Sequence, residues 1–263
     1  MSMIPGMTLQ TDRAVSFGIA AHDYDRYRVG PPAEIADLLA PTPCASVLDL
    51  GAGTGALTRV LAARVPQVYA VDRDPRMIAV LERNCPGVTA MEGTAERIPL
   101  PDAAVEAVTA ASAWHWMDPE LAVPEVTRVL RPGGTLGLMW NRRDRTAPWI
   151  AELEAFRLSV TGTEDWIEER VHHYLEQPWL PAGSRFGRIE TGQLPWHTVM
   201  TRDEVAGLMT TFHGFLTVPD ELKPAMVEQF EEYAHSDAVP GIPDREDLVE
   251  IPMMCHFWRA SLD

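Results

Sequence analysis

The stretch VLDLGAGTGALTRVLA, residues 47–62, constrains the fold of this chain more than any other part of the sequence. An apolar run leads into glycines at every second position, and an apolar pattern of helical period follows directly. Because glycine adopts backbone conformations that other residues avoid, this order predicts a buried strand, a tight turn and a helix. Turns of this kind present backbone N–H groups and a helix N-terminus to a bound cofactor.

The glycine spacing alone leaves the cofactor undecided. Gly51, Gly53 and Ala56 satisfy the dinucleotide fingerprint G-x-G-x-x-G/A. Gly51, Gly53 and Gly55 equally fit the G-x-G-x-G turn of methyltransferases. Other residues must therefore distinguish the two classes.

Strands and helices are predicted to alternate between residues 45 and 141. The expected strands are SVLDL, QVYAVD, GVTAME, AVEAVTAAS and GTLGLMW. Helical patterns separate most of them, and one helix is predicted to open with Asp74 as N-cap and Pro75 as its first residue. This alternation predicts right-handed βαβ units, and hence a doubly wound, Rossmann-like α/β fold with a mostly parallel sheet.

We expect three parts along the chain. Residues 1–30 are predicted to form an N-terminal lid helix, and residues 31–145 a cofactor-binding core. Residues 146–263 are expected to complete the sheet and add a C-terminal helical cap within the same domain. The late alternation of LVEIPMMCHFWRA predicts an antiparallel closing strand, with GRIETGQLPWHTV as its hairpin partner.

Charge and cysteine content restrict the partners and the compartment. The net charge is −16, and an acidic surface repels phosphate backbones, so we expect no nucleic-acid partner. No apolar run reaches the ~20 residues that span a bilayer, and the N-terminus lacks the pattern of a signal peptide. The three cysteines are far apart and have no metal-ligand spacing. We therefore expect a cytoplasmic protein with no metal and no membrane partner.

Three acidic residues indicate which cofactor the turn holds. Asp49 lies two residues before Gly51, where its carboxylate would repel a pyrophosphate and suit a cationic group such as the ammonium of a methionine moiety. Asp72 ends the second predicted strand and can accept hydrogen bonds from both ribose hydroxyls, which nicotinamide enzymes also require. Glu96 follows the third predicted strand and can bind an adenine amino group.

With these motifs in order, the chain resembles the class I S-adenosylmethionine (SAM)-dependent methyltransferases. It is similar to the small-molecule methyltransferase type 11 group, which includes trans-aconitate methyltransferase. The resemblance rests on SFGIAAHDYDRYR, VLDLGAGTGALTRVLA, VYAVDRDPRMIAVLE, EGTAERIPLPDAAVEAV, ASAWHWMDPELAVPEVTRVLRPGG and LGLMWNRRD. It implies SAM as cofactor, S-adenosylhomocysteine as product, and in-line methyl transfer to an O, N or C atom of a small-molecule acceptor.

The resemblance also implies contacts to the cofactor along the chain. They are the lid residues Tyr24 and Arg28, the methionine-end residues Asp49, Gly51, Ala52 and Gly53, the ribose residue Asp72 with the adjoining Arg73, the adenine residues Thr94, Ala95 and Glu96, and the sulfonium-side residues Ala111 and Ser112. The lid reads YDRYRVGPP where such lids usually read Y…RPGYP, and Arg28 is retained.

Candidate catalytic residues follow the fourth predicted strand, because open α/β sheets bind ligands at the carboxyl ends of their strands. His115 and Trp116, in WHWMD, either pack locally or line the acceptor site, with His115 as a general base or as part of the wall. Trp140 and Asn141 are second choices. Histidines in the predicted cap, at positions 172, 173 and 213, are weaker candidates.

Two other functions compete with methyl transfer. An NAD(P)-dependent oxidoreductase would share the fold and Asp72, but it must accommodate Asp49, and the chain has no Tyr-x-x-x-Lys pair because Lys223 is its only lysine. A non-catalytic SAM-binding protein would retain every cofactor residue, since methyl transfer requires no obligatory catalytic side chain.

Overall fold

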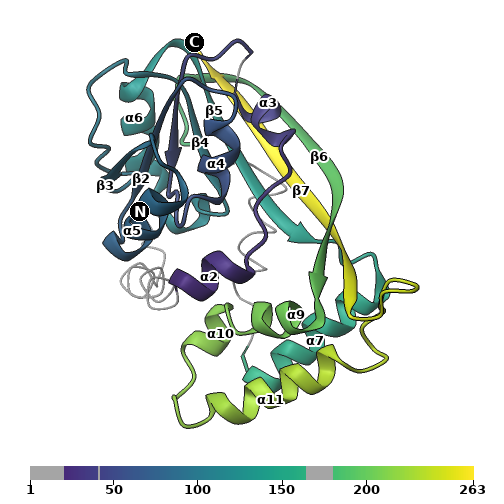
Figure 1. The fold of residues 1–263 in the computed structure, drawn as a ribbon. Coiled ribbons are helices and arrows are strands. Elements are labelled where there is room, and N and C mark those ends of the chain that lie inside the picture. Colours follow the sequence, from purple (N-terminus) through teal and green to yellow (C-terminus); the bar gives the residue numbers. More distant parts are fainter. Residues whose placement is uncertain (1–20, 41, 164–179) are drawn as a thin grey trace. The chain divides into compact units, whose positions relative to one another are not determined.

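The computed structural model describes residues 21–40, 42–163 and 180–263 (Figure 1). These residues divide into two compact units. The first, called here the sheet unit, comprises residues 30–40, 42–141, 180–194 and 255–263. The second, called here the helical unit, comprises residues 21–29, 142–163 and 195–254.

Seven strands of the described residues form one sheet in the order β3-β2-β1-β4-β5-β7-β6 (Figure 1). They are β1 Ser46–Leu50, β2 Gln67–Asp72, β3 Thr89–Glu92, β4 Val105–Ala111, β5 Leu130–Arg143, β6 Phe186–Thr201 and β7 Leu248–Leu262. The pairs β1–β2, β1–β4, β2–β3 and β4–β5 are parallel, and one closing strand is antiparallel. The predicted Rossmann-like fold class is confirmed, and β6 lies beside β7 as predicted.

The helices of the sheet unit begin where the sequence carries helix-start signals. These helices are α3 Ile35–Leu39, α4 Ala56–Ala62, α5 Pro75–Asn84, the short 3₁₀ helix η1 Trp114–Trp116, and α6 Pro119–Val129. The Asp74 carboxylate accepts a hydrogen bond from the backbone N–H of Arg76 at 2.9 Å, with Pro75 as the first residue of α5. Asp118 and Pro119 open α6 in the same way. The predicted Asp-Pro start of α5 is therefore confirmed.

One strand is longer than predicted. Strand β5 already begins at Leu130, four residues before the predicted strand GTLGLMW, so it includes the Pro-Gly-Gly sequence. Leu130 pairs with Val105, and the register then shifts before Thr135 pairs with Ala107. The extra residues bulge out of the ladder, which glycine allows because it lacks a Cβ atom. Helix α3 starts at Ile35, after a turn that follows the two prolines.

The helical unit contains α2 Ala21–Tyr27, α7 Pro148–Thr161, α9 Arg202–Met209, α10 His213–Leu216 and α11 Lys223–Ala234 (Figure 1). Its core is built on Ile150, Leu153, Val205 and Phe230, which are all buried. Thr201 and Glu204 form a reciprocal capping box at the start of α9. The apolar periodicity that predicted helices in this part of the chain is thus satisfied by burial of their apolar faces.

Some predictions fall outside the described residues. These include residues 1–20 of the predicted lid, and residues 164–179 of the predicted completing segment with the histidines at positions 172 and 173. The division into a lid, a core and a completing segment stays a prediction. In the described ranges, no helix is both long enough and apolar enough to pass through a bilayer.

Candidate functional site

The glycine turn lies where the strand order of the sheet reverses direction, between β1 and its neighbour β4. The backbone N–H groups of Gly51 and Ala52 both donate to the carbonyl oxygen of Val71 on β2, at 2.8 and 3.0 Å. The chain then passes through Gly53 and Gly55, whose φ angles are +56° and +91°, and Gly55 caps the start of α4. The turn is therefore fixed to the neighbouring strand and leads directly into a helix N-terminus.

Two glycines of the turn differ in what surrounds them. A Cβ atom on Gly51 would lie 2.7 Å from the Cβ atom of Ala113, so the chain needs glycine there for packing. A Cβ atom on Gly53 would meet no atom within 4 Å. The backbone at Gly53 thus borders open space, where a ligand can approach closely.

Asp49 is a buried carboxylate beneath this turn. Its Oδ2 atom accepts a hydrogen bond from the Thr58 hydroxyl at 2.6 Å, whereas its Oδ1 atom is buried and has no hydrogen-bond partner among the described residues. Burial raises the pKa of Asp49 to about 7, and the nearby Asp72 carboxylate adds to the increase. A buried acceptor without a donor is costly, so this position favours a ligand that brings a positively charged donor.

Asp72 ends β2, as the sequence predicted. Its two carboxylate oxygens accept backbone N–H groups, Oδ2 from Gly53 at 2.8 Å and Oδ1 from Asp74 at 2.9 Å. Desolvation raises the pKa of Asp72 although these two hydrogen bonds act against it. The carboxylate is therefore held at the edge of the glycine turn. The adjoining Arg73 is exposed.

The predicted adenine residues form the loop after β3. Ala95 is buried, and Thr94 pairs with Arg97 in an isolated bridge that tightens the loop. The Glu96 Oε1 atom accepts a hydrogen bond from the backbone N–H of Asp118 at 3.2 Å. This bond links the loop after β3 to the N-cap of α6, which follows β4.

The carboxyl end of β4 carries the predicted sulfonium-side residues. Ala111 ends the strand beside Met139 of β5. Ser112 follows with a φ angle of +49°, and its N–H donates to the Met139 carbonyl oxygen at 2.8 Å. A non-glycine residue in this left-handed region is strained and is held here by that hydrogen bond.

The candidate catalytic residues His115 and Trp116 lie on η1, directly after this bend. His115 is buried, and its Nδ1 atom accepts a hydrogen bond from the Trp140 indole Nε1–H at 3.3 Å. The ring of Trp116 contacts the imidazole with 4.9 Å between centroids. In a neutral imidazole whose Nδ1 accepts a hydrogen bond, the ring proton is on Nε2.

The lid residues belong to the helical unit. The Arg28 guanidinium donates through Nε to the Thr211 hydroxyl at 2.9 Å and through Nη2 to the Thr211 carbonyl at 3.2 Å. Its Cζ atom lies 5.3 Å from the centroid of the Tyr24 ring. The other predicted site residues, from Asp49 to Trp116, belong to the sheet unit.

Sequence reasoning missed Thr58 and the role of Trp140, which both support the site. Thr58 hydrogen bonds Asp49 from the helix that follows the glycine turn, and its position nine residues after the aspartate was the available signal. Trp140 was considered as a pocket residue, but its role as the donor to His115 has no sequence signature, because it depends on the pairing of β4 with β5.

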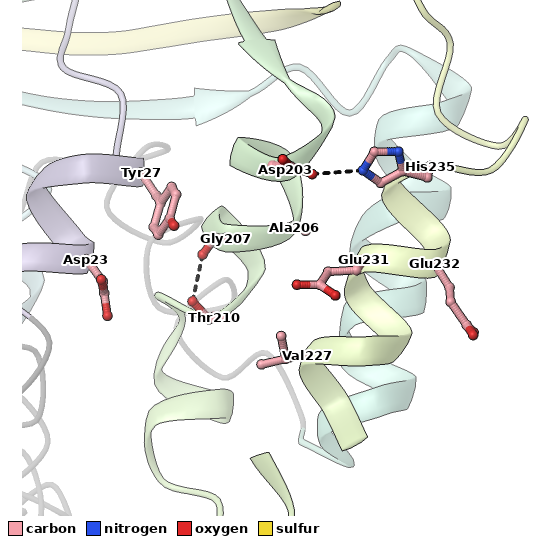
Figure 2. A pocket seen from close by; sticks show the side chains of 10 residues that line it. All are labelled: Asp23, Tyr27, Asp203, Ala206, Gly207, Thr210, Val227, Glu231, Glu232 and His235. Atoms are coloured by element: carbon pink, nitrogen blue, oxygen red, sulfur yellow. Dashed lines mark hydrogen bonds and ion pairs between the residues drawn. The ribbon is translucent and has the colours of Figure 1, made fainter. Parts of the chain in front are cut away.

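A pocket of about 720 Å³ lies in the helical unit (Figure 2). It is lined by Asp23, Tyr27, Asp203, Ala206, Gly207, Thr210, Val227, Glu231, Glu232 and His235. Asp203 and His235 form an ion-pair contact at 2.9 Å, which Figure 2 marks. None of the predicted cofactor or catalytic residues lines this pocket. Among the described side chains, no group of three His, Cys, Asp or Glu residues is arranged to hold a metal ion.

Comparison with known proteins decides the family. The model of the methyltransferase domain matches residues 48–138, which include the glycine turn, Asp72 and the end of β4. A methyltransferase of Mycobacterium tuberculosis is 40% identical over 219 residues, covering 83% of this chain and 85% of the relative. The chain belongs to the methyltransferase family. The resemblance inferred from its motifs is confirmed, and the protein is an enzyme of the methyltransferase class.

Two further comparisons concern fold and relatives. A solved methyltransferase structure from Anaeromyxobacter dehalogenans has a TM-score of 0.64 and 25% identity, and covers 90% of this chain and 98% of that one. A trans-aconitate 2-methyltransferase of Azoarcus is 34% identical over 137 residues, 46% of this chain and 54% of the relative. The fold similarity thus extends over almost the whole chain, whereas the similarity to the second relative covers about half.

Proposed function

We propose that this methyltransferase uses S-adenosylmethionine and transfers its methyl group to an O, N or C atom of a small-molecule acceptor. The observation that carries the proposal is the buried Asp49 carboxylate, which has one oxygen without a hydrogen-bond partner among the described residues. A carboxylate at this position suits the ammonium of a methionine moiety and opposes the pyrophosphate of a dinucleotide. The nicotinamide-dependent alternative is disfavoured for that reason.

The remaining roles follow from the position of each residue. When bound, the cofactor supplies an electrophilic methyl group on a sulfonium, so the protein mainly binds, orients and excludes water. Asp72 is proposed to accept the ribose hydroxyls, and the bare backbone at Gly53 to border the cofactor. The loop of Thr94, Ala95 and Glu96 is proposed to flank the adenine. Ala111 and Ser112 are proposed to face the methionine end.

We propose a wall role for His115 and Trp116 at the acceptor site. The Nδ1 lone pair of His115 accepts the Trp140 indole N–H, so a neutral imidazole in this tautomer has no lone pair with which to remove a proton. Tyr24 and Arg28 are proposed to contact the cofactor, as the family resemblance implies. The small-molecule class is supported by the trans-aconitate relative, and the acidic net charge of −16 argues against nucleic acid. Cytoplasmic location is part of the same proposal.

The proposal is tested by titration calorimetry with S-adenosylhomocysteine and with NADH in one buffer. We expect S-adenosylhomocysteine to bind and NADH to give no heat, and Asp49→Asn to weaken binding. NADH binding without a response to S-adenosylhomocysteine would establish the oxidoreductase alternative. Binding without production of S-adenosylhomocysteine from SAM across an acceptor panel would make the chain a non-catalytic binder.

A further inference from the structure

The loop after β3, which carries the predicted adenine residues, is fixed at its start by the strand that carries Asp72. The backbone N–H of Gly93 donates to the Asp72 carbonyl oxygen at 3.0 Å. A Cβ atom on Gly93 would lie 2.7 Å from the Cδ atom of Pro99, so the later part of the loop packs against its first residue. The path of residues 94–98 therefore depends on what holds the far end of the loop.

Two side chains of α6 hold that far end. The backbone N–H of Ile98 donates to Glu125 Oε2 at 2.9 Å, and the Ile98 carbonyl oxygen accepts from Arg128 Nη2 at 3.0 Å. Arg128 Nη1 also donates to the carbonyl oxygen of Leu100 at 2.7 Å. Glu125 and Arg128 are three residues apart in the helix, so they point to the same side of it. The buried backbone around Ile98 is thus tied to one face of α6.

Glu125 and Arg128 also hold each other. The Nε and Nη2 atoms of Arg128 donate to the two carboxylate oxygens of Glu125 at 2.7 and 2.8 Å, which makes a bidentate pair. This guanidinium lowers the pKa of Glu125, so the carboxylate is ionised at neutral pH. Because a bidentate pair fixes the orientation of both side chains, the acceptor and the donors that reach the loop are held in one geometry.

The same helix contacts the adenine part of the loop more directly. Glu96 lies two residues before Ile98, and its Oε1 atom accepts the backbone N–H of Asp118 at the N-cap of α6. The loop is therefore attached to α6 at both ends of the helix, through Glu96 at the start and through Arg128 in the last turn. Without the second attachment the loop would have more conformations, and a ligand would bind only the fraction in which Glu96 is in place.

We propose that Glu125 and Arg128 are positioning residues for the adenine site, which act on the cofactor through the loop after β3. This inference rests on the proposed function, in which Thr94, Ala95 and Glu96 flank the adenine. The pair orders the loop before the cofactor arrives, so binding does not have to supply that ordering. Loss of the pair should lower the affinity for the cofactor, and the loss should depend on the adenine amino group.

The test uses Arg128→Gln, Arg128→Lys and Glu125→Gln, with Arg131→Gln as a matched control. Arg131 follows in β5 and makes the same kinds of contact, an ion pair with Glu106 and a hydrogen bond to the Ala103 carbonyl oxygen. Both of these partners lie beyond the adenine part of the loop. Arg128→Lys keeps the charge but loses the fork, and it provides both measurements if Arg128→Gln does not fold.

The first measurement is hydrogen exchange of the ligand-free proteins. We expect the amides of residues 94–100 to exchange faster in Arg128→Gln and Glu125→Gln than in the wild type, because their local opening becomes easier. Arg128→Lys should be intermediate, and Arg131→Gln should match the wild type in this segment.

The second measurement is the affinity for S-adenosylhomocysteine and for S-inosylhomocysteine, in which an oxo group replaces the adenine amino group. Arg128→Gln should weaken S-adenosylhomocysteine roughly tenfold, the factor expected when about a tenth of the molecules have the loop in its binding conformation. The affinity for S-inosylhomocysteine should change much less, because its base brings no amino donor to Glu96. The preference of the enzyme for the amino-bearing base should therefore shrink.

Either of two results would overturn the inference. One is equal exchange of residues 94–100 in the wild type and all variants, and the other is a loss of affinity that is the same for both ligands, as general destabilisation predicts. The exchange measurement needs no cofactor. A wild type that binds neither ligand would therefore contradict the proposed function and with it the adenine role, while the exchange rates would still show whether the pair holds the loop.

Discussion

The two units each bury a carboxylate, and the two carboxylates have opposite pKa shifts. The pKa of Asp49 in the sheet unit is raised to about 7, whereas the pKa of Glu154 in the helical unit is lowered to about 2. Burial acts upward on both, so the neighbours decide the outcome. Asp49 lies beside the Thr58 hydroxyl and the Asp72 carboxylate, whereas Glu154 accepts hydrogen bonds from Arg143 and Arg157.

The difference separates charges that stabilise the fold from charges that await a ligand. Glu154 and its arginines satisfy one another within the chain, so removing one partner exposes the others. Asp49 is buried without a counter-charge among the described residues. Such groups reduce the stability of the ligand-free protein, and ligand sites are where proteins tolerate that cost.

The largest effect is expected for Glu154→Gln. Losing this carboxylate removes the negative charge that Arg143 and Arg157 share, which should lower the free energy of unfolding by roughly 3–5 kcal/mol. Urea denaturation at pH 7 measures the change. Glu152→Gln is the control, because Glu152 is exposed on the same helix and should change stability by less than about 0.5 kcal/mol. Equal stabilities of the two variants would contradict the pairing.

The pH dependence of this effect has a defined sign. The pKa of Glu154 is lower in the folded protein than in the unfolded chain, so its contribution is present above about pH 4.5 and lost as pH falls toward 2. The stability difference between wild type and Glu154→Gln should therefore shrink as pH is lowered through that window. A difference that stays constant from pH 6 to pH 3 would show that Glu154 is not ionised in the fold.

The next largest effect is expected for Asp72→Asn in the sheet unit. Two charge-assisted hydrogen bonds to ribose hydroxyls contribute roughly 1.5–3 kcal/mol each, so the variant should bind S-adenosylhomocysteine more than tenfold more weakly. Titration calorimetry measures the constant. Glu92→Gln is the control, since Glu92 pairs with Asp72 across β2 and β3 and is exposed. An unchanged constant for Asp72→Asn would remove it from the cofactor site.

Asp49→Asn should increase the stability of the protein at high pH but weaken the binding of S-adenosylhomocysteine. The raised pKa of Asp49 means that stability falls as pH rises from about 4 through 7, by up to roughly 4 kcal/mol. The uncharged variant should therefore be more stable at pH 8, by roughly 1–3 kcal/mol after its own unpaired amide is counted. At pH 5 this gain should disappear. Denaturation of both proteins at the two pH values provides the measurement.

The affinity for S-adenosylhomocysteine should depend on the same ionisation of the Asp49 carboxyl group. A cationic ligand requires the ionised carboxylate, so wild-type affinity for S-adenosylhomocysteine should rise between pH 6 and 7 and proton release should accompany binding below pH 7. Asp49→Asn should bind more weakly and lose this part of the pH dependence. If wild type and variant show the same pH profile, then Asp49 does not face the ligand.

Gly53→Ala tests whether the turn is open to a ligand, with Gly87→Ala as control. Both glycines have positive φ angles and no atom within 4 Å of an added Cβ atom, so each substitution should cost roughly 1–2 kcal/mol of stability. Only Gly53→Ala should lower the affinity for S-adenosylhomocysteine, by about tenfold, because the methyl group of the new alanine occupies the space above the turn. Similar affinities in the two variants would place the ligand elsewhere.

The fold and the cofactor side of the site could be predicted because their signals are local. The strand, turn and helix around Gly51 and Gly53 lie within one short stretch, and Asp49 and Asp72 are placed by the strands that they belong to. The hydrogen bond between Arg28 and Thr211 could not be predicted in the same way. Arg28 and Thr211 are 183 positions apart and meet only through the packing of α2 and α9. The bulge in β5 depends on its pairing with β4, which a single strand does not reveal.

The smallest effect is expected for His115→Gln, and its form distinguishes a wall from a base. Because the Nδ1 lone pair already accepts the Trp140 indole N–H, the neutral ring has no second lone pair with which to remove a proton. We therefore expect KM for the acceptor to rise a few-fold while kcat stays nearly constant. A general base would instead lower kcat by ~10²–10⁴-fold, with recovery at high pH. Trp140→Phe sharpens the test, since it keeps a ring but removes the donor that orients the imidazole. Trp140→Phe should reproduce part of the KM increase. If KM and kcat are unchanged in Trp140→Phe but impaired in His115→Gln, then His115 acts without this hydrogen bond.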